Sequence, residues 1–131
     1  MIVVDTNILV YLYLPCEFTP QAEQLLLDEP QWATPILWQS EFRNVLAGIL
    51  RRGQLTLVQA VQLQQEAETM MAGFEFDVSS ESVLTLVERS DCSAYDCEFV
   101  TLAQHLGVKL ITMDGKILRA FPETAVALTA R

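Results

Sequence analysis

Residues 1–14 read MIVVDTNILVYLYL, two apolar runs separated by a polar segment. The first run, Met1 to Val4, is typical of a short buried strand that ends at Asp5. Thr6 can cap the second run, Ile8 to Leu14, as a helix that stops near Pro15. The start of the chain therefore predicts a buried strand, an aspartate at its carboxyl end and a helix directly after it.

The same alternation of strands and helices continues along the chain. Helices are expected at Pro20–Asp28, Leu37–Arg52, Leu55–Ala72, Ser80–Glu88, Ser93–Leu106 and shortly after Asp114, and strands at Trp32–Ile36, Phe74–Val78 and Lys109–Met113. No repeat or Gly/Ser-rich linker divides the sequence. We expect one domain, residues 1–131, of the α/β class, with three α/β/α layers around a mainly parallel central sheet.

Composition narrows the possible chemistry. The cysteines, Cys16, Cys92 and Cys97, are odd in number and lack C-x-x-C spacing, so they are expected to be buried and reduced rather than disulfide-bonded or zinc-bound. His105 is the only histidine, so a Ser-His-Asp site or a His-rich zinc site would depend on it alone. The longest apolar stretch, Ile8 to Pro15, is less than half of the ~20 residues that cross a bilayer. We expect a cytoplasmic protein with no membrane partner.

The formal net charge of -9 at pH 7 opposes unaided binding of RNA or DNA, which usually requires a basic patch. The acidic side chains can form a solvated surface that keeps the protein soluble, or some of them can be held together by a divalent cation. Their positions in the predicted elements distinguish these two explanations.

Two aspartates directly follow predicted strands, Asp5 after the first and Asp114 after the last. Ligands of parallel α/β sheets bind beyond the carboxyl ends of the strands, where the connecting loops meet. A single aspartate in such a position can simply begin a turn or cap a helix. Two in comparable positions favour a shared site.

Asp96 and Glu98 fall at the start of one predicted helix. Asp96 lies three residues after the expected cap Ser93, where an acid also favours the helix dipole. It falls within about 60° of the centre of the apolar stripe, whereas Glu98 falls on the opposite face. The stripe consists of Tyr95, Phe99, Leu102, Ala103 and Leu106. A carboxylate beside the core must be paired, hydrogen-bonded or metal-bound, so Asp96 is a candidate site residue and Glu98 is expected to be solvated.

Glu41 occupies the border of an apolar helix face that contains Trp38, Phe42, Val45, Leu46 and Ile49. This position is poorly suited to a purely solvated carboxylate. An ion pair with Arg52 or Lys116 is an equally good explanation of the sequence, so Glu41 alone decides nothing.

Four carboxylates at one end of a sheet would repel one another strongly unless a cation lay between them. Oxygen ligands suit the hard ions Mg²⁺ and Mn²⁺, which also bind phosphate oxygens. Such an ion can orient a phosphodiester, help to generate the attacking hydroxide and stabilise the leaving oxygen. Metal-dependent hydrolysis is the reaction that this set of residues indicates.

The sequence resembles the PIN domains, and among them the small ribonuclease toxins of VapBC-type toxin–antitoxin pairs. The resemblance spans the whole chain and is carried by four motifs in order: IVVDTNIL at 2–9, SEFRNVL at 40–46, SAYD at 93–96 and LITMD at 110–114. It implies a magnesium-dependent (or manganese-dependent) endoribonuclease with Asp5, Glu41, Asp96 and Asp114 as the catalytic acids.

The resemblance also implies individual roles and partners. Asp5, Asp96 and Asp114 would bind the metal, Glu41 would act largely through water, and supporting polar residues would be Thr6, Asn7 and Thr112. An RNA substrate, a homodimer and a protein antitoxin whose C-terminal arm covers the site are expected. Cys97 and Glu98 depart from the small residues that often follow the third acid. Candidates for phosphate contacts are Arg43, Arg51, Arg52, Lys116 and Arg119.

Three rival interpretations remain. A haloacid-dehalogenase-like phosphatase would need a second aspartate two residues after the first, where this chain has Asn7. A receiver domain would pair acids after its first strand, where only Asp5 is present. A non-catalytic PIN-like module that binds a partner is disfavoured by the intact set of acids.

Overall fold

The central strand of the structure is the one that opens the sequence. In the computed structural model, which describes residues 1–131, five strands pair in parallel in the order β3-β2-β1-β4-β5. The strands are β1 (Ile2–Val4), β2 (Trp32–Pro35), β3 (Glu75–Phe76), β4 (Leu110–Thr112) and β5 (Ala125–Ala127). The prediction of an α/β domain with a mainly parallel sheet is confirmed.

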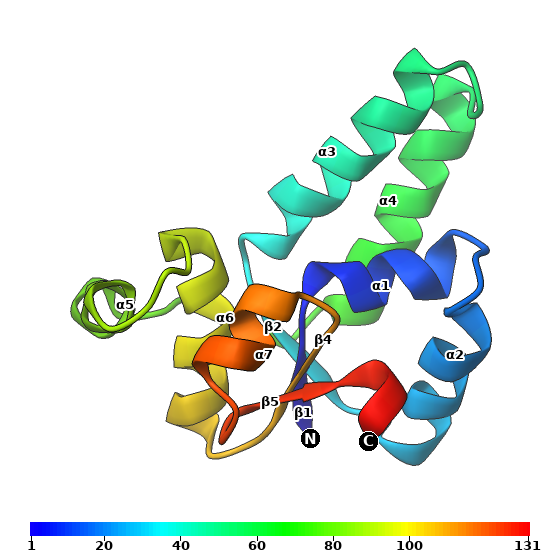
Figure 1. The fold of residues 1–131 in the computed structure, drawn as a ribbon. Helices are drawn as coiled ribbons and strands as arrows, with labels where there is room; N and C mark the ends of the chain where they lie inside the picture. Colours follow the sequence, from blue (N-terminus) through cyan, green and yellow to red (C-terminus); the bar gives the residue numbers. More distant parts are fainter.

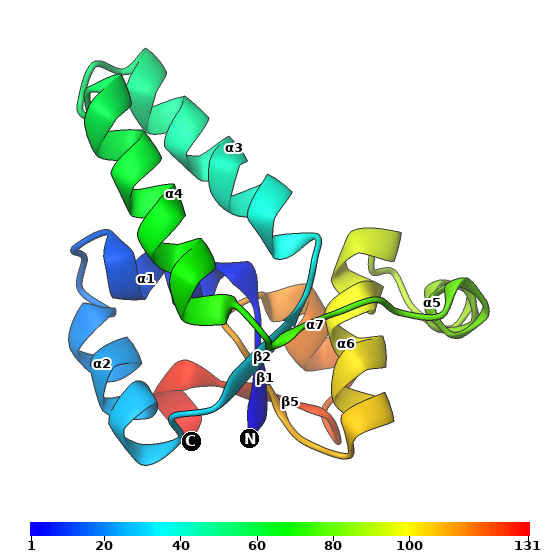
Figure 2. The ribbon, with the colours of Figure 1, turned by 180° about the vertical axis from the view of Figure 1, so that it is seen from behind.

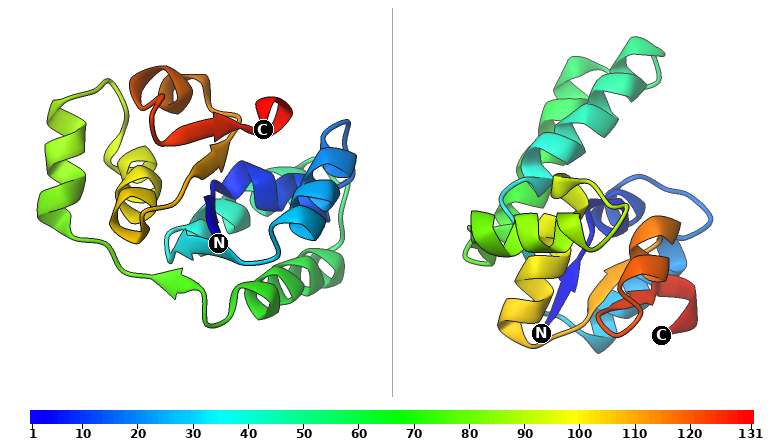
Figure 3. Two further views of the ribbon diagram at one scale, coloured as in Figure 1. Left: turned by 90° about the horizontal axis from the view of Figure 1, so that it is seen from below. Right: turned by 60° about the vertical axis from the view of Figure 1, so that its left-hand side comes forward.

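Seven α-helices surround this sheet. They are α1 (Thr6–Tyr13), α2 (Thr19–Asp28), α3 (Trp38–Arg51), α4 (Leu57–Met71), α5 (Ser80–Glu88), α6 (Ala94–Leu106) and α7 (Gly115–Ala120), and a 3₁₀ helix, Leu128–Ala130, follows β5. Helices α1, α2 and α4 lie on one side of the sheet and α6 on the other, with α5 packed against α6 (Figures 1 and 2). Helices α3 and α4 form a hairpin that projects beyond the sheet (Figure 3).

Local chemistry explains where several helices begin and end. The Asp5 side chain, rather than that of Thr6, caps α1, so the helix begins two residues earlier than Ile8. Helix α4 begins with a capping box between Thr56 and Gln59. Helix α6 ends at Gly107, which adopts the left-handed conformation at φ 67° that glycine tolerates best.

The C-terminal strand β5 and the 3₁₀ helix were not expected from the sequence. Strand β5 has three residues, pairs only with β4 and is partly exposed, so it lacks the length and periodicity of a recognisable strand. Strand β3 is also shorter than the expected Phe74–Val78, because only two residues pair with β2.

The core spans both faces of the sheet and contains 29 buried hydrophobic residues in one cluster. Val3 and Val4 of β1 are fully buried, as expected for a central strand covered on both faces. Cys92 and Cys97 are buried as expected, but Cys16 is exposed, because it lies in the turn between α1 and α2; all three thiols are free. None of the helices combines the length and the apolarity needed to span a membrane.

Phe42 provides a test of the packing beneath the α3–α4 hairpin. Its ring is fully buried and makes edge-on contacts with Trp38 and Tyr13. Phe42→Ala should lower the free energy of unfolding by about 3–5 kcal/mol, because it removes a large side chain and leaves a cavity. Urea denaturation measures the loss. Val58→Ala, on the exposed side of α4, should cost no more than about 0.5 kcal/mol, and equal losses would contradict the packing described here.

Candidate active site

A cavity of about 700 Å³ opens at the carboxyl ends of β1 and β4, between the first turns of α1, α3 and α6. All four predicted acids, Asp5, Glu41, Asp96 and Asp114, line it. The other lining residues are Thr6, Asn7, Val10, Leu37, Ser40, Asn44, Val45 and Tyr95. The structure therefore brings together side chains that are up to 109 positions apart in the sequence, from Asp5 to Asp114.

Asp5 is held by hydrogen bonds from two directions. Its Oδ1 accepts from the Thr6 backbone N–H at 2.8 Å, and its Oδ2 accepts from the Thr112 hydroxyl at 2.7 Å. The Thr112 oxygen in turn accepts from the Asp114 backbone N–H at 3.0 Å. Thr112 does not line the cavity, but it links the carboxylate after β1 to the backbone after β4.

Asp114 is the N-cap of α7. Its Oδ1 accepts from the backbone N–H groups of Lys116 and Ile117, at 2.9 and 3.2 Å. Asp114 thus caps a helix, which was the alternative to a functional role that its position in the sequence allowed. It is compatible with a site role, because these bonds occupy only one of the two carboxylate oxygens while the residue still lines the cavity.

Glu41 approaches from the first turn of α3. Its Oε1 accepts a hydrogen bond from the Thr6 hydroxyl at 2.7 Å. The alternative ion pair with Arg52 or Lys116 is not formed, since the two ion pairs of the protein join Met1 to Glu29 and Arg131 to Asp28.

Asp96 lines the cavity, but the helical projection placed its neighbours wrongly. Tyr95, assigned to the buried stripe, is 62% exposed at the cavity. Glu98, expected to be solvated, is half-buried in a second pocket. The reason is tertiary packing: α5 lies against α6 and covers part of the face that the projection assigned to solvent. Asp96 also forms a capping box with Ser93, as its position in the sequence suggested.

The electrostatics of the cavity are those of uncompensated acids. The pKa of Asp5 is raised to about 6, mainly by burial, with smaller increases from the charges of Glu41 and Asp96 and with hydrogen bonds from Thr112 and Thr6 opposing the shift. Burial also raises the pKa of Glu41, with additional increases from Asp96 and Glu98. No Lys or Arg side chain lines the cavity to offset these charges.

The side chains that line the cavity offer oxygen atoms to a divalent cation. No group of three or more His, Cys, Asp or Glu side chains is close enough to form a ready metal cage. The chemistry of the donors nevertheless fits Mg²⁺ or Mn²⁺, because every candidate ligand atom is an oxygen. Several of these oxygens belong to carboxylates, whose like charges repel one another until a cation binds. The buried Asn7 Oδ1 lacks a hydrogen-bond partner and is a further oxygen donor. Metal binding by Asp5, Asp96 and Asp114 stays a prediction.

Sequence reasoning did not single out three polar residues of the cavity: Ser40, Asn44 and Tyr95. The spacing of residues along a predicted helix could have identified two of them. Asn44 follows Glu41 by three residues and Ser40 by four, so all three share one side of α3. None of the five basic residues proposed for phosphate contacts lines the cavity, and their role stays a prediction.

The fold and this cavity define a PIN domain: the family model described as "PIN domain" matches residues 2–122, and the chain belongs to that family. A relative, Ribonuclease VapC3 of Pyrobaculum aerophilum, is 28% identical over 124 residues, which cover 92% of this chain and 95% of that protein.

Two solved structures have the same fold. A toxin-antitoxin complex from Klebsiella pneumoniae contains a chain with a TM-score of 0.71 and 22% identity, covering 98% of both chains. The crystal structure of PAE2754 from Pyrobaculum aerophilum has a TM-score of 0.75 and 20% identity, covering 97% of this chain and 90% of that one. The resemblance to the PIN family noted in the sequence is confirmed.

The raised pKa of Asp5 predicts a specific dependence of stability on pH. Between about pH 4 and pH 6 the folded state retains a proton on Asp5 that the unfolded chain has lost, so stability falls as the pH rises through this range. Two pKa units correspond to about 3 kcal/mol. In EDTA, Asp5→Asn should therefore gain stability over the native protein by up to this amount from pH 4 to pH 7.

Urea denaturation of both proteins at several pH values measures this difference. Asp91→Asn, which removes an exposed carboxylate from the loop before α6, serves as the control and should follow the native curve. A stability difference between Asp5→Asn and the native protein that does not change with pH would contradict the buried, repelled carboxylate.

Proposed function

We propose that the protein is a metal-dependent endoribonuclease that hydrolyses RNA phosphodiester bonds with Mg²⁺ or Mn²⁺. The observation that carries this proposal is the convergence of Asp5, Glu41, Asp96 and Asp114 on one cavity of a PIN domain. The similarity to Ribonuclease VapC3 supports RNA as the substrate.

Each residue has a role that follows from its surroundings. Asp5, Asp96 and Asp114 would hold the cation, with Asn7 Oδ1 as a further donor. The bound ion would supply orientation of the scissile phosphate and activation of the attacking water. Glu41 suits the role of proton acceptor for that water, because its pKa is raised and the Thr6 hydroxyl fixes one of its oxygens. Thr112 positions Asp5.

The alternatives are less well supported. A metal-free ribonuclease mechanism would require histidine, but His105 lines a different pocket, between α5 and α6. A phosphatase with an aspartate nucleophile would lack its second aspartate, because that position is Asn7, whose side-chain oxygen has no partner. A non-catalytic module that only binds a partner would not require four carboxylates in one cavity.

The biological role that we propose is that of a toxin in a toxin–antitoxin pair. The similarity to a chain of the Klebsiella pneumoniae toxin-antitoxin complex supports a protein antitoxin as partner. The homodimer and the cytoplasmic location expected from the sequence are part of the same proposal.

The purified protein, freed of any bound partner, should cleave RNA with Mg²⁺ or Mn²⁺ and stop when EDTA is added. Asp96→Asn should reduce the rate at least about 100-fold, because it removes a charge proposed to hold the cation. Gel analysis of labelled RNA fragments measures both effects. Asp91→Asn makes the same chemical change outside the cavity and should leave the rate within about twofold.

Cleavage that persists in EDTA would contradict the metal requirement. Absence of cleavage under every metal condition, by a protein that still folds, would instead favour the non-catalytic module.

Tyr95 offers an exposed aromatic ring beside the carboxylates, and aromatic rings stack on bases of single-stranded RNA. Tyr95→Ala should raise KM about 5- to 100-fold with a smaller change in kcat, whereas Tyr95→Phe should behave like the native protein. Steady-state kinetics on a short single-stranded RNA separate the two constants. A loss of kcat in both variants would assign Tyr95 to the chemistry through its hydroxyl instead.

A further inference from the structure

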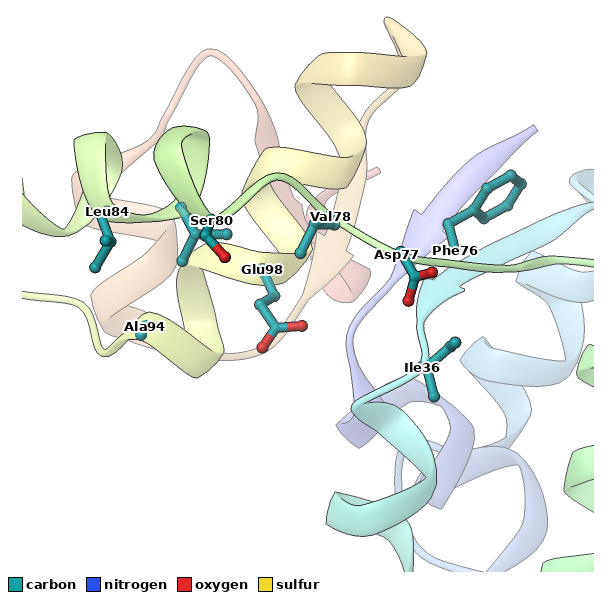
Figure 4. Close-up of a pocket in the computed structure, with 9 residues that line it drawn as sticks. Ile36, Phe76, Asp77, Val78, Ser80, Leu84, Ala94 and Glu98 are labelled. Atoms are coloured by element: carbon teal, nitrogen blue, oxygen red, sulfur yellow. The ribbon is translucent and has the colours of Figure 1, made fainter.

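A second pocket, of about 360 Å³, is lined by residues adjacent in sequence to those of the carboxylate cavity, and Figure 4 shows its side chains. Its walls come from the ends of β2 and β3, from α5 and from α6, and are mainly apolar. We call it the Glu98 pocket; its lining residues include Ile36, Asp77, Val78, Leu84, Ala94 and Glu98. The PIN-family motifs do not account for it, and Glu98 is one of the positions where this chain departs from the family pattern.

The Glu98 carboxylate lies within these apolar walls without a partner. Figure 4 shows it directed into the space between α6 and the segment that carries Asp77 and Val78. It accepts no side-chain hydrogen bond and forms no ion pair. Asp77, across the pocket, is likewise unpaired, and no Lys or Arg lines the walls. The pocket therefore holds two carboxylates, half-buried Glu98 and exposed Asp77, that form no ion pair within the protein.

The acidity continues into the neighbouring cavity. Ala94 of the pocket and Tyr95 of the cavity are adjacent on α6, as are Ile36 and Leu37 before α3. A strand of RNA crossing this surface would bring phosphates against these carboxylates, whereas a basic segment of protein would neutralise them.

The rim of the pocket is apolar and open to solvent. Ile36 is 48% exposed and Leu84 is 61% exposed, so both side chains are accessible to a ligand at the mouth of the pocket. A ligand that fits both features has an apolar stem and a cationic head, which is the chemistry of arginine and lysine. Arginine fits best, because its guanidinium can donate two hydrogen bonds to one carboxylate.

We propose that the Glu98 pocket receives an arginine or lysine side chain from a basic segment of a partner protein, with a neighbouring apolar residue of that segment resting on Ile36 and Leu84. The inference goes beyond the proposed function, because it concerns a site outside the cavity and requires neither RNA cleavage nor a metal ion.

The test uses the native full chain in EDTA and a synthetic peptide, acetyl-Ala-Leu-Arg-Leu-Ala-amide. A matched peptide replaces arginine with citrulline, which keeps the shape and removes the charge. Amide chemical shifts in ¹⁵N-labelled protein should change at Ile36, Val78 and Leu84 when the arginine peptide is titrated. Glu98→Gln should weaken binding about tenfold, because it removes a charged hydrogen-bond acceptor, and Glu88→Gln, exposed on α5 outside the pocket, should not.

Several results would overturn the proposal. These are no shifts with the peptide at millimolar concentration, equal binding of the citrulline peptide, equal weakening by Glu98→Gln and Glu88→Gln, or shifts confined to Asn44 and Tyr95 of the cavity. Tighter binding of a short RNA by Glu98→Gln, with no peptide binding, would assign this surface to the substrate instead. RNA cleavage can fail in the native protein while peptide binding succeeds, so the two proposals are judged separately.

Discussion

The pairing of β1 with β4 is the constraint on which the rest of the site depends. The register sets Val4 beside Ile111, and the Asp5 backbone N–H donates to the Ile111 carbonyl at 2.9 Å. The next residues, Asp5 and Thr112, are therefore side by side where the two strands end, and their side chains form a hydrogen bond. Because β1 pairs with β2 on one side and β4 on the other, a one-residue slip would exchange the faces on which Val3 and Val4 pack as well as separate the two side chains.

The parts of the site that sequence reasoning predicted are those set by local chemistry. Asp5 and Asp114 follow strands, and Ser93 begins the helix of Asp96, so strand ends and capping patterns suffice to place them. The helix limits were predicted to within two residues for the same reason, since caps and glycines terminate α4 and α6.

The parts that were missed depend on distant packing. The environment of Glu98 is made by α5 and by the end of β3, neither of which the periodicity of α6 reveals. Tyr95 is exposed because the first turn of α6 faces the cavity rather than another element. Strand β5 exists through its pairing with β4 and has too few residues to show a pattern of its own. Tertiary contacts, in each case, overrode a local expectation.

The hydrogen bond between Thr112 and Asp5 joins residues 107 positions apart, and that between Thr6 and Glu41 joins residues 35 apart. During synthesis the N-terminus emerges first, so Asp5 and Glu41 are present long before Thr112, the hydrogen-bond partner of Asp5, and the last acid, Asp114, have been added. A ribosome-bound chain that lacks β4 has no second strand to orient Asp5 and no fourth carboxylate. The full arrangement of acids thus becomes available only when nearly the whole domain has been translated, so the acidic cavity forms late in the synthesis of the chain.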